Sequence, residues 1–419
     1  MSNTEEIPFI DRYRTRTKTN KGVRYFFLGL FLSAVLCIIA LGLSHIIWAG
    51  IETFIRSTDL EQCEKKVVGY FRLSHGGELR ESQLSKLTHV IFSSFWYSEH
   101  EKSIKYRGGE DEKVFKAVLE RSGRFDLVKM FNLESLNSHT IMNHGRLISK
   151  AITSFIGTHE LDGVNIVLPD PITHTDFDHL TTMCESIRKN LNDLAESSGR
   201  SRPYVISLLV PQTKLALDFN TLLKSVDFLN LDISHYYCSW FPTEWNHLTG
   251  PASPLHSWHP NGTERNVHDT LRHYSCLTKK PNRLVMIFAF SGRYWSNVIP
   301  PKDSKDNIWM TAEKINGTVH GGWSWWRDMK RNGWKLSSAK WSDESKTSYI
   351  WDPKTRTQYH IEDERSLKEK VRYAIEKNIG GVGVWSTGED EDEDTLLNVF
   401  VKGDLCERRD DLSVNYQCE

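Results

Sequence analysis

Short apolar runs recur along residues 67–386, and amphipathic segments separate them. Such runs, bounded by turn residues, are typical of buried strands, whereas apolar residues spaced three and four apart are typical of helices. Helical patterns of this kind occupy residues 178–194 and 365–377. We expect strands at residues 67–71, 89–95, 126–132, 163–168, 204–210, 228–235, 283–291 and 381–386. Eight units in strand-then-helix order favour a parallel sheet that closes, so the expected fold is α/β, a (β/α)8 barrel.

The last connection of this pattern is much longer than the others. The seventh and eighth expected strands begin about 100 residues apart, and a connection of that length needs structure of its own. We therefore expect a small α+β insertion at residues 297–363, with a hairpin over residues 349–359. Tryptophans are frequent there, and they form either a compact aromatic core or, for one or two of them, a surface for stacking on a ligand.

The N-terminal region predicts a membrane anchor. Residues 25–49 are almost unbroken apolar sequence, long enough to span a bilayer and too long for a cleaved signal peptide or an ordinary core helix. Arginines and lysines precede the span, and the flank after it is mixed in charge, which favours a cytosolic N-terminus. We expect a cytosolic tail at residues 1–24, a type II signal anchor at 25–49, a stem at 50–62 and a lumenal or extracellular domain at 63–401.

The remaining composition agrees with that placement. A tail at residues 402–419 carries two of the six cysteines beyond the span, an even number that suits an oxidising compartment, although sequence leaves their pairing open. Asn261 and Asn316 begin glycosylation sequons. The formal net charge of −1 gives no reason to expect nucleic acid. His256 and His259 lack a third ligand at metal-binding spacing, so we expect neither a metal nor a cofactor.

One predicted strand carries the clearest family signature. Residues 161–169 read Leu-Asp-Gly-Val-Asn-Ile-Val-Leu-Pro, which resembles the D-G-x-D-x-D-x-E signature of family 18 glycoside hydrolases, the chitinases. Residues 86–92, 226–231, 284–293 and 380–385 are similar to other strands of that family, so the resemblance covers nearly all of residues 63–401. It implies a (β/α)8 barrel with an insertion before strand eight. Within the family, the chain looks most like invertebrate chitinase-like proteins.

The signature departs from the family where its chemistry lies. The resemblance implies that Pro169 stands in place of the acid that protonates the leaving group, and Val167 in place of the Asp that assists the substrate's acetamido group. Asn165, Val167 and Pro169 share one face of the strand, and none is a proton donor at neutral pH. Asp170 is one residue out of phase and faces the other way, where a turn or helix-cap role is expected. Asp162 is expected to anchor the start of the strand.

Other family positions are partly lost and partly kept. Ser234 stands in place of a Tyr that would hold the acetamido oxygen, His235 replaces an Asp, and Ser291 replaces a Tyr. By resemblance, the ligand-binding candidates are Trp385 as the floor beneath the sugar, with Arg293, Tyr70 and His235; Trp385 alternatively closes the barrel core. The acidic run at residues 389–394 is expected to be a solvated face at the start of a last helix.

Three functions follow from this combination. We expect a catalytically inactive, membrane-anchored chitinase-like protein that binds chitin or a related N-acetylglucosamine glycan, or a protein partner. The first alternative is an active hydrolase with a relocated acid, such as Asp170 or His235. The second is a protein-interaction scaffold without a sugar site.

Overall fold

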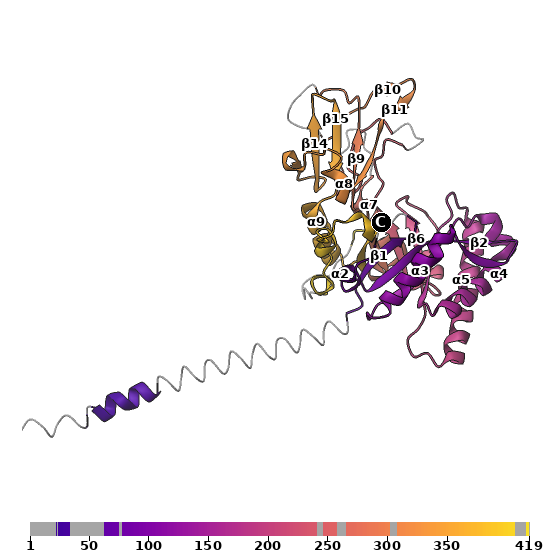
Figure 1. Cartoon of the computed structure of the whole chain (residues 1–419), viewed down its shortest axis with the longest axis horizontal. Helices are drawn as coiled ribbons and strands as arrows, with labels where there is room; N and C mark the ends of the chain where they lie inside the picture. The colour runs from indigo at the N-terminus through magenta and orange to yellow at the C-terminus, as the bar shows by residue number, and fades with distance from the viewer. Residues whose placement is uncertain are drawn as a thin grey trace, which may run out of the picture. The chain divides into compact units, whose positions relative to one another are not determined.

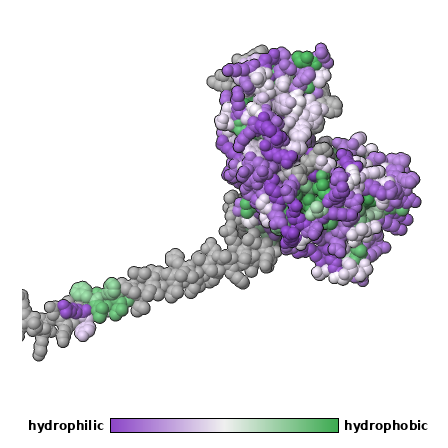
Figure 2. Space-filling model, viewed as in Figure 1, coloured by the Kyte–Doolittle hydropathy of each residue, from purple (hydrophilic) through white to green (hydrophobic). Residues whose placement is uncertain are grey.

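The computed structural model describes residues 22, 24–33, 63–74, 78–240, 246–257, 265–301, 308–406 and 416–418. The chain divides into two compact units, Met1–Cys63 and Glu64–Glu419. In the first unit, residues 24–33 are helical and expose large apolar side chains (Figures 1 and 2). Most of the expected anchor, from residue 34 onward, and all of the expected stem lie outside the described residues. In the part of the chain that is described, no helix is both long and apolar enough to cross a membrane.

The second unit contains the predicted barrel (Figure 1). Its eight parallel strands are β1 (Lys66–Arg72), β2 (His89–Ser98), β4 (Val128–Glu134), β5 (Gly163–Val167), β6 (Val205–Pro211), β7 (Phe228–Asp232), β8 (Leu284–Phe288) and β16 (Gly381–Trp385). They pair in the order β1-β16-β8-β7-β6-β5-β4-β2, and β1 pairs with β2, which closes the barrel. The short strand β3 (Ser103–Tyr106) pairs with β2 in antiparallel orientation.

Alternation along the strands separates two cores. On β1, Val67 and Phe71 face the helices and join the large outer core, whereas Val68 and Tyr70 face the lumen. The lumen cluster is Val68, Tyr70, Ile91, Met130, Phe228, Val285 and Ile287. Because successive lumen-facing positions lie two residues apart, each strand's last inward side chain sits at the carboxyl-end mouth of the barrel, where the site residues described below are found.

Helices with clear end signals follow most strands. They are α2 (Glu81–Leu84), α3 (Gly109–Ser122), α4 (Ser138–His159), α5 (His174–Ser198), α6 (Phe219–Leu222), α7 (Val267–Thr278), α9 (Glu364–Glu376) and α10 (Lys402–Leu405). Thr173 caps α5 in a capping box with Asp176, and Gly199 ends it with a left-handed φ of 66°. Asp363 caps α9 in the same way through Ser366. These local signals explain why the amphipathic segments begin and end where they do.

A second sheet lies between β8 and β16. It contains β9 (Ser291–Trp295), β12 (Gly321–Trp325), β13 (Lys340–Ser342), β14 (Thr347–Asp352) and β15 (Thr357–Ile361), in the antiparallel order β12-β9-β15-β14-β13. The helix α8 (Trp326–Met329) and the hairpin β10 (Lys314–Ile315)–β11 (Thr318–Val319) accompany it. The hairpin expected at residues 349–359 is β14–β15. The sheet begins at Ser291, ahead of the expected start at residue 297, because β9 continues the chain directly from the barrel.

The tryptophans of this insertion divide between core and surface. Trp334 packs with Met329, Ile350 and Ile361 in a small core of the second sheet. Trp323 is 48% exposed and lies 5.4 Å from the ring of Trp325. An aromatic core therefore accounts for only part of the set.

A disulfide ties the described residues 416–418 to the second unit. Cys276 on α7 bonds Cys418, with the Cα atoms 5.5 Å apart, and Cys63 and Cys406 are each disulfide-bonded. Cys184 and Cys238 are buried free thiols. The surface of this unit is mostly hydrophilic on the face that Figure 2 shows, as its apolar residues fill the cores of the barrel and of the second sheet.

Candidate functional site

The lumen-facing row of β5 is neutral, and its one polar side chain, Asn165, is hydrogen-bonded at both ends. The Asn165 side chain is wholly buried; its Nδ2 donates to Asn132 Oδ1 at 2.6 Å. Its Oδ1 accepts from Ser207 Oγ at 2.7 Å and from Asn230 Nδ2 at 3.0 Å. Four strands, β4 to β7, therefore share one network of uncharged groups. Buried polar groups need such partners, and this network occupies the barrel interior below the mouth.

The end of β5 lacks a carboxyl group, as the sequence indicates. Val167 is partly exposed at the last position of the strand, and Pro169 is buried beyond it. Asp170, the next residue, is exposed. Asp162 anchors the start of the strand as expected: its carboxylate accepts the Lys129 backbone N–H at 2.8 Å and pairs with Arg200 at 2.7 Å.

An aromatic pair forms the floor beside this row. The rings of Tyr70 and Trp385 lie 4.8 Å apart between centroids, at the carboxyl ends of the neighbouring strands β1 and β16. Tyr70 is wholly buried, and its hydroxyl accepts a hydrogen bond from Asn230 Nδ2 at 3.0 Å. Trp385 is partly exposed. Tyr70 is thus part of the lumen cluster, and the partly exposed Trp385 packs against that cluster, as the alternative of a residue that closes the barrel core predicts.

Strand β7 ends in a compact polar cluster. The Asp232 carboxylate accepts the backbone N–H of Ser234 at 3.1 Å and its hydroxyl, and it lies 3.5 Å from His235 Nδ1. The Ser234 hydroxyl also contacts His235 Nδ1. Burial raises the pKa of Asp232, but hydrogen bonds and charge from His235 and Ser234 outweigh burial and leave that pKa below its ordinary value. This carboxylate is therefore held in its ionised form.

A second carboxylate lies at the mouth, at a position that the sequence pattern did not indicate. Glu134 is the last residue of β4, and the pairing of Leu133 with Ile166 places it beside Val167. Glu134 Oε1 accepts from Ser93 Oγ at 2.6 Å and from Asn132 Nδ2 at 2.8 Å. The expected strand ends at Asn132, two residues too early, which leaves Glu134 outside it. Glu134 lies two residues after the lumen-facing Asn132, and residues two apart on a strand face the same side. This spacing is the sequence signal that could have identified Glu134.

A buried acid follows the floor tryptophan. Glu389 lies in the short 3-10 helix η3 (Thr387–Glu389), is 5% exposed, and its backbone N–H donates to the Ser386 carbonyl at 3.1 Å. Burial raises the pKa of Glu389 to about 8, although the charges of Arg293 and Arg72 oppose the shift. Among the described neighbours, no side chain hydrogen-bonds Glu389 Oε2. At neutral pH this group is mostly a neutral acid enclosed behind the mouth.

Arg293 is also enclosed. It is 3% exposed, and its Nη1 donates to Ser291 Oγ at 2.7 Å and to the Gly292 carbonyl. The guanidinium lies 5.1 Å from the ring centre of Trp240, which is 42% exposed. Arg293 therefore contributes a buried positive charge, and its side chain is not exposed to solvent.

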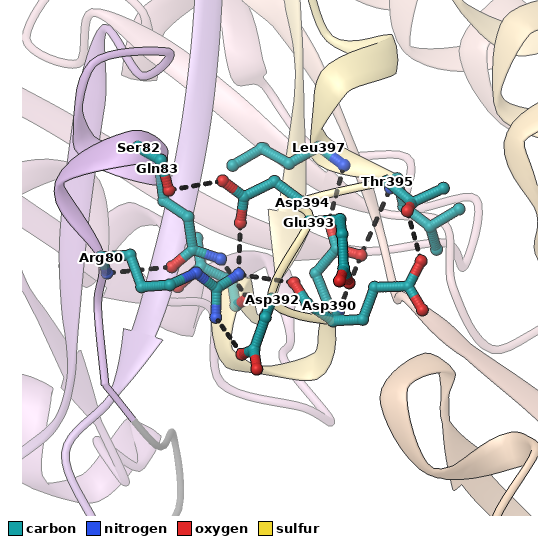
Figure 3. A network of polar contacts seen from close by, with 12 residues as sticks. Arg80, Ser82, Gln83, Asp390, Asp392, Glu393, Asp394, Thr395 and Leu397 are labelled. Atoms are coloured by element: carbon teal, nitrogen blue, oxygen red, sulfur yellow. Dashed lines mark hydrogen bonds and ion pairs between the residues drawn. The ribbon is translucent and has the colours of Figure 1, made fainter.

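The acidic run after β16 is a structural clamp, which corrects the expected solvated face (Figure 3). Asp394 is buried and accepts hydrogen bonds from Arg80, Ser82 and Lys86. Asp390 accepts the Leu397 backbone N–H at 2.8 Å, at the start of a 3-10 helix, η4 (Leu397–Val399). Only Asp392 and Glu393 of the run are exposed. The clamp fixes the loop that carries Glu389 to α2.

Of the four ligand-binding candidates, Trp385 and His235 reach the surface of the mouth, whereas Tyr70 and Arg293 are buried.

Asn316 is exposed at the β10–β11 turn, and Asn261 lies outside the described residues, as does His259. The ring of His256 packs against His268. Within the described residues, no group of three or more His, Cys, Asp or Glu side chains is arranged to hold a metal ion.

Comparison with known proteins identifies the family of this chain. The chain matches the profile of the glycosyl hydrolases family 18 over residues 66–390, which is most of its length, and it belongs to that family. A curated relative, a probable endochitinase of Caenorhabditis elegans, is 24% identical over 254 residues, covering 58% of this chain and 39% of the relative. The chain thus spans well under half of that relative's length.

Solved structures share the fold at low sequence identity. A family 18 N-acetylglucosaminidase from Paenibacillus barengoltzii superposes with a TM-score of 0.67 at 19% identity, covering 81% of this chain and 99% of that one. A mutant class V chitinase from Nicotiana tobaccum, in complex with NAG4, gives 0.66 at 16% identity, covering 80% and 99%. These likenesses establish the barrel.

Proposed function

We propose that this protein binds an N-acetylglucosamine glycan, such as a chitin fragment, at the barrel mouth without hydrolysing it. The observation that carries the proposal is the neutral row on β5. Asn165 is hydrogen-bonded to neighbouring amide and hydroxyl groups, and Val167 and Pro169 stand where the family signature has carboxyl groups. The partly exposed Trp385 offers an aromatic face of the kind that packs against sugar rings. The Nicotiana tobaccum chitinase that is similar in fold was solved with NAG4, which supports this class of ligand.

Asp232 and Glu389 are poorly suited to supply the missing acid, which leaves Glu134 as the carboxyl group at the mouth that a hydrolysis assay must test. A general acid must be protonated at the working pH and within hydrogen-bond reach of the leaving group. Asp232 is held ionised, so it is an acceptor and not a donor. Glu389 holds a proton at neutral pH but is 5% exposed, so a ligand on Trp385 does not reach it. His235 contacts Ser234 and Asp232 through Nδ1, so the relocated-acid alternative at this residue depends on Nε2.

A calorimetric titration of the full-length protein with tetra-N-acetylchitotetraose tests the binding. We expect saturable binding that Trp385→Ala weakens by roughly 30-fold or more, because loss of a central aromatic contact costs about 2 kcal/mol. Trp341→Ala is the control, since β13 lies at the edge of the second sheet opposite β12. Absence of heat with this and longer chitooligosaccharides would favour the alternative, a protein-interaction scaffold.

The anchor and its orientation belong to the same proposal. Residues 24–33 expose Tyr25, Phe26, Phe27 and Phe31 at more than half of their surface, an apolar cluster that needs a lipid or protein covering. With positive charge before the span, the second unit is placed on the lumenal or extracellular side of a single-pass type II protein.

Glycosylation reports that orientation. Asn316 is exposed on a turn, where an oligosaccharide can be attached. When the chain is expressed in eukaryotic cells, we expect N-glycanase to increase its gel mobility, and the shift to shrink in Asn316→Gln. A chain whose mobility is unchanged by N-glycanase contradicts the lumenal placement.

A further inference from the structure

Two carboxylates approach the floor of the mouth from opposite sides. In the order of paired strands around the barrel, β2 lies between β1 and β4, and β16 and β8 lie between β1 and β7. Glu134 ends β4 and Asp232 ends β7, so they flank Tyr70 on β1. Burial raises the pKa of Tyr70, and the charges of Asp232 and Glu134 raise it further.

Each carboxylate has one oxygen held by the protein and one left over. Glu134 Oε1 accepts from Ser93 and Asn132, and Asp232 Oδ1 accepts from Ser234. Glu134 Oε2 and Asp232 Oδ2 have no hydrogen bond to any described residue, and neither is a buried atom. The Asp232 side chain is 33% exposed, and Glu134 is also partly exposed. Two acceptor oxygens are therefore fixed in direction and open to a ligand.

Their negative charge is not cancelled by a nearby Lys or Arg. Among the described residues, Glu134 forms no ion pair, and the one ion-pair contact of Asp232 is His235 at 3.5 Å. The charges of Arg72 and Arg293 act instead on Glu389, behind the floor tryptophan. The carboxylates at the ends of β4 and β7 therefore have no ion-paired Lys or Arg among the described residues.

We propose that Glu134 and Asp232 select an amino sugar with a free ammonium group, a glucosamine unit, over its N-acetylated form. This inference rests on the proposed glycan-binding function and moves its preferred ligand from fully acetylated to partly deacetylated chitin. An ammonium donates charge-assisted hydrogen bonds to carboxylate oxygens, roughly twice as strong as those of a neutral amide N–H. The face of Trp385 also attracts a cation, whereas an acetamido group carries no charge. A partly deacetylated chitin would present both features to the mouth.

Paired titrations of the full-length protein test the selection. We expect the glucosamine tetramer to bind at least about tenfold more tightly than tetra-N-acetylchitotetraose at pH 5.5, where the sugar amines are protonated. Glu134→Gln and Asp232→Asn should each weaken the glucosamine tetramer several-fold and leave the acetylated tetramer within about twofold. Glu120→Gln, an exposed carboxylate on α3, is the matched control and should change neither affinity.

Salt dependence gives a second readout that needs no variant. Raising NaCl from 50 to 500 mM should weaken the glucosamine tetramer markedly and the acetylated tetramer little, because only the former forms an ion pair. Equal affinities with equal salt dependence overturn the selection and leave glycan binding intact. Binding of neither tetramer overturns the glycan-binding function itself, so the two failures are distinguishable.

Discussion

Glu389→Gln should abolish a loss of stability that the natural protein shows as the pH rises. In the folded state, burial raises the pKa of Glu389 to about 8, whereas the unfolded chain ionises near the ordinary value of 4.5. Between these values the unfolded state binds fewer protons, so the free energy of unfolding falls with increasing pH. A pKa difference of one between the two states corresponds to about 1.4 kcal/mol, and we expect the variant to gain about 3 kcal/mol relative to the natural protein from pH 5 to 8.5.

Urea unfolding of both proteins across this pH range measures the difference. Glu393→Gln is the control, because Glu393 is exposed in the same acidic run. Its profile should run parallel to that of the natural protein. Parallel profiles for Glu389→Gln as well would mean that Glu389 is ionised in the folded state and that the wall behind Trp385 carries a charge.

Lys370→Met should be among the most destabilising single substitutions in the second unit. Lys370 on α9 is wholly buried, with Nζ 2.6 Å from Glu362 Oε2 and 5.7 Å from the ring centre of Phe288 on β8. Burial raises the pKa of Glu362 and lowers that of Lys370, so each group depends on the other to remain charged. Removing one partner of a buried pair costs about 3–5 kcal/mol, because the other is left uncompensated.

The same reasoning predicts that a double replacement is mild. Glu362→Met with Lys370→Met should recover most of the lost stability, since apolar replacement of a buried pair is often neutral or stabilising. Lys368→Met is the control on the same helix, because its side chain is 62% exposed and 3.6 Å from Glu364, and it should change stability by less than about 0.5 kcal/mol. A Lys370→Met protein as stable as this control refutes the account of the pair.

The barrel could be predicted from the sequence because local patterns specify it. The apolar runs from residue 67 to residue 386 mark all eight strands within a few residues. The length of the last connection marks the second sheet, although not its first strand, because β9 follows β8 almost without a break. Periodicity reports which elements form, and turn and cap residues report where they end.

The site was less predictable because burial and strand ends are tertiary properties. Glu134 was missed since the expected strand stopped two residues short of the mouth. The acidic run appeared solvated by composition, yet Asp394 is buried against Arg80, a contact between residues more than 300 positions apart. Family resemblance located Tyr70 and Arg293 at the site but did not reveal that both lie beneath its surface.

A hydrolysis assay tests the central claim most directly, namely that the mouth of this barrel has no accessible proton donor for a glycosidic oxygen. Full-length protein is incubated with tetra-N-acetylchitotetraose at pH 5 to 8, and the products are followed by mass spectrometry. The account predicts an intact tetramer, with cleavage no faster than in buffer. Release of shorter oligomers by the natural protein, abolished in Glu134→Gln or Asp232→Asn, would contradict it and identify a relocated catalytic group.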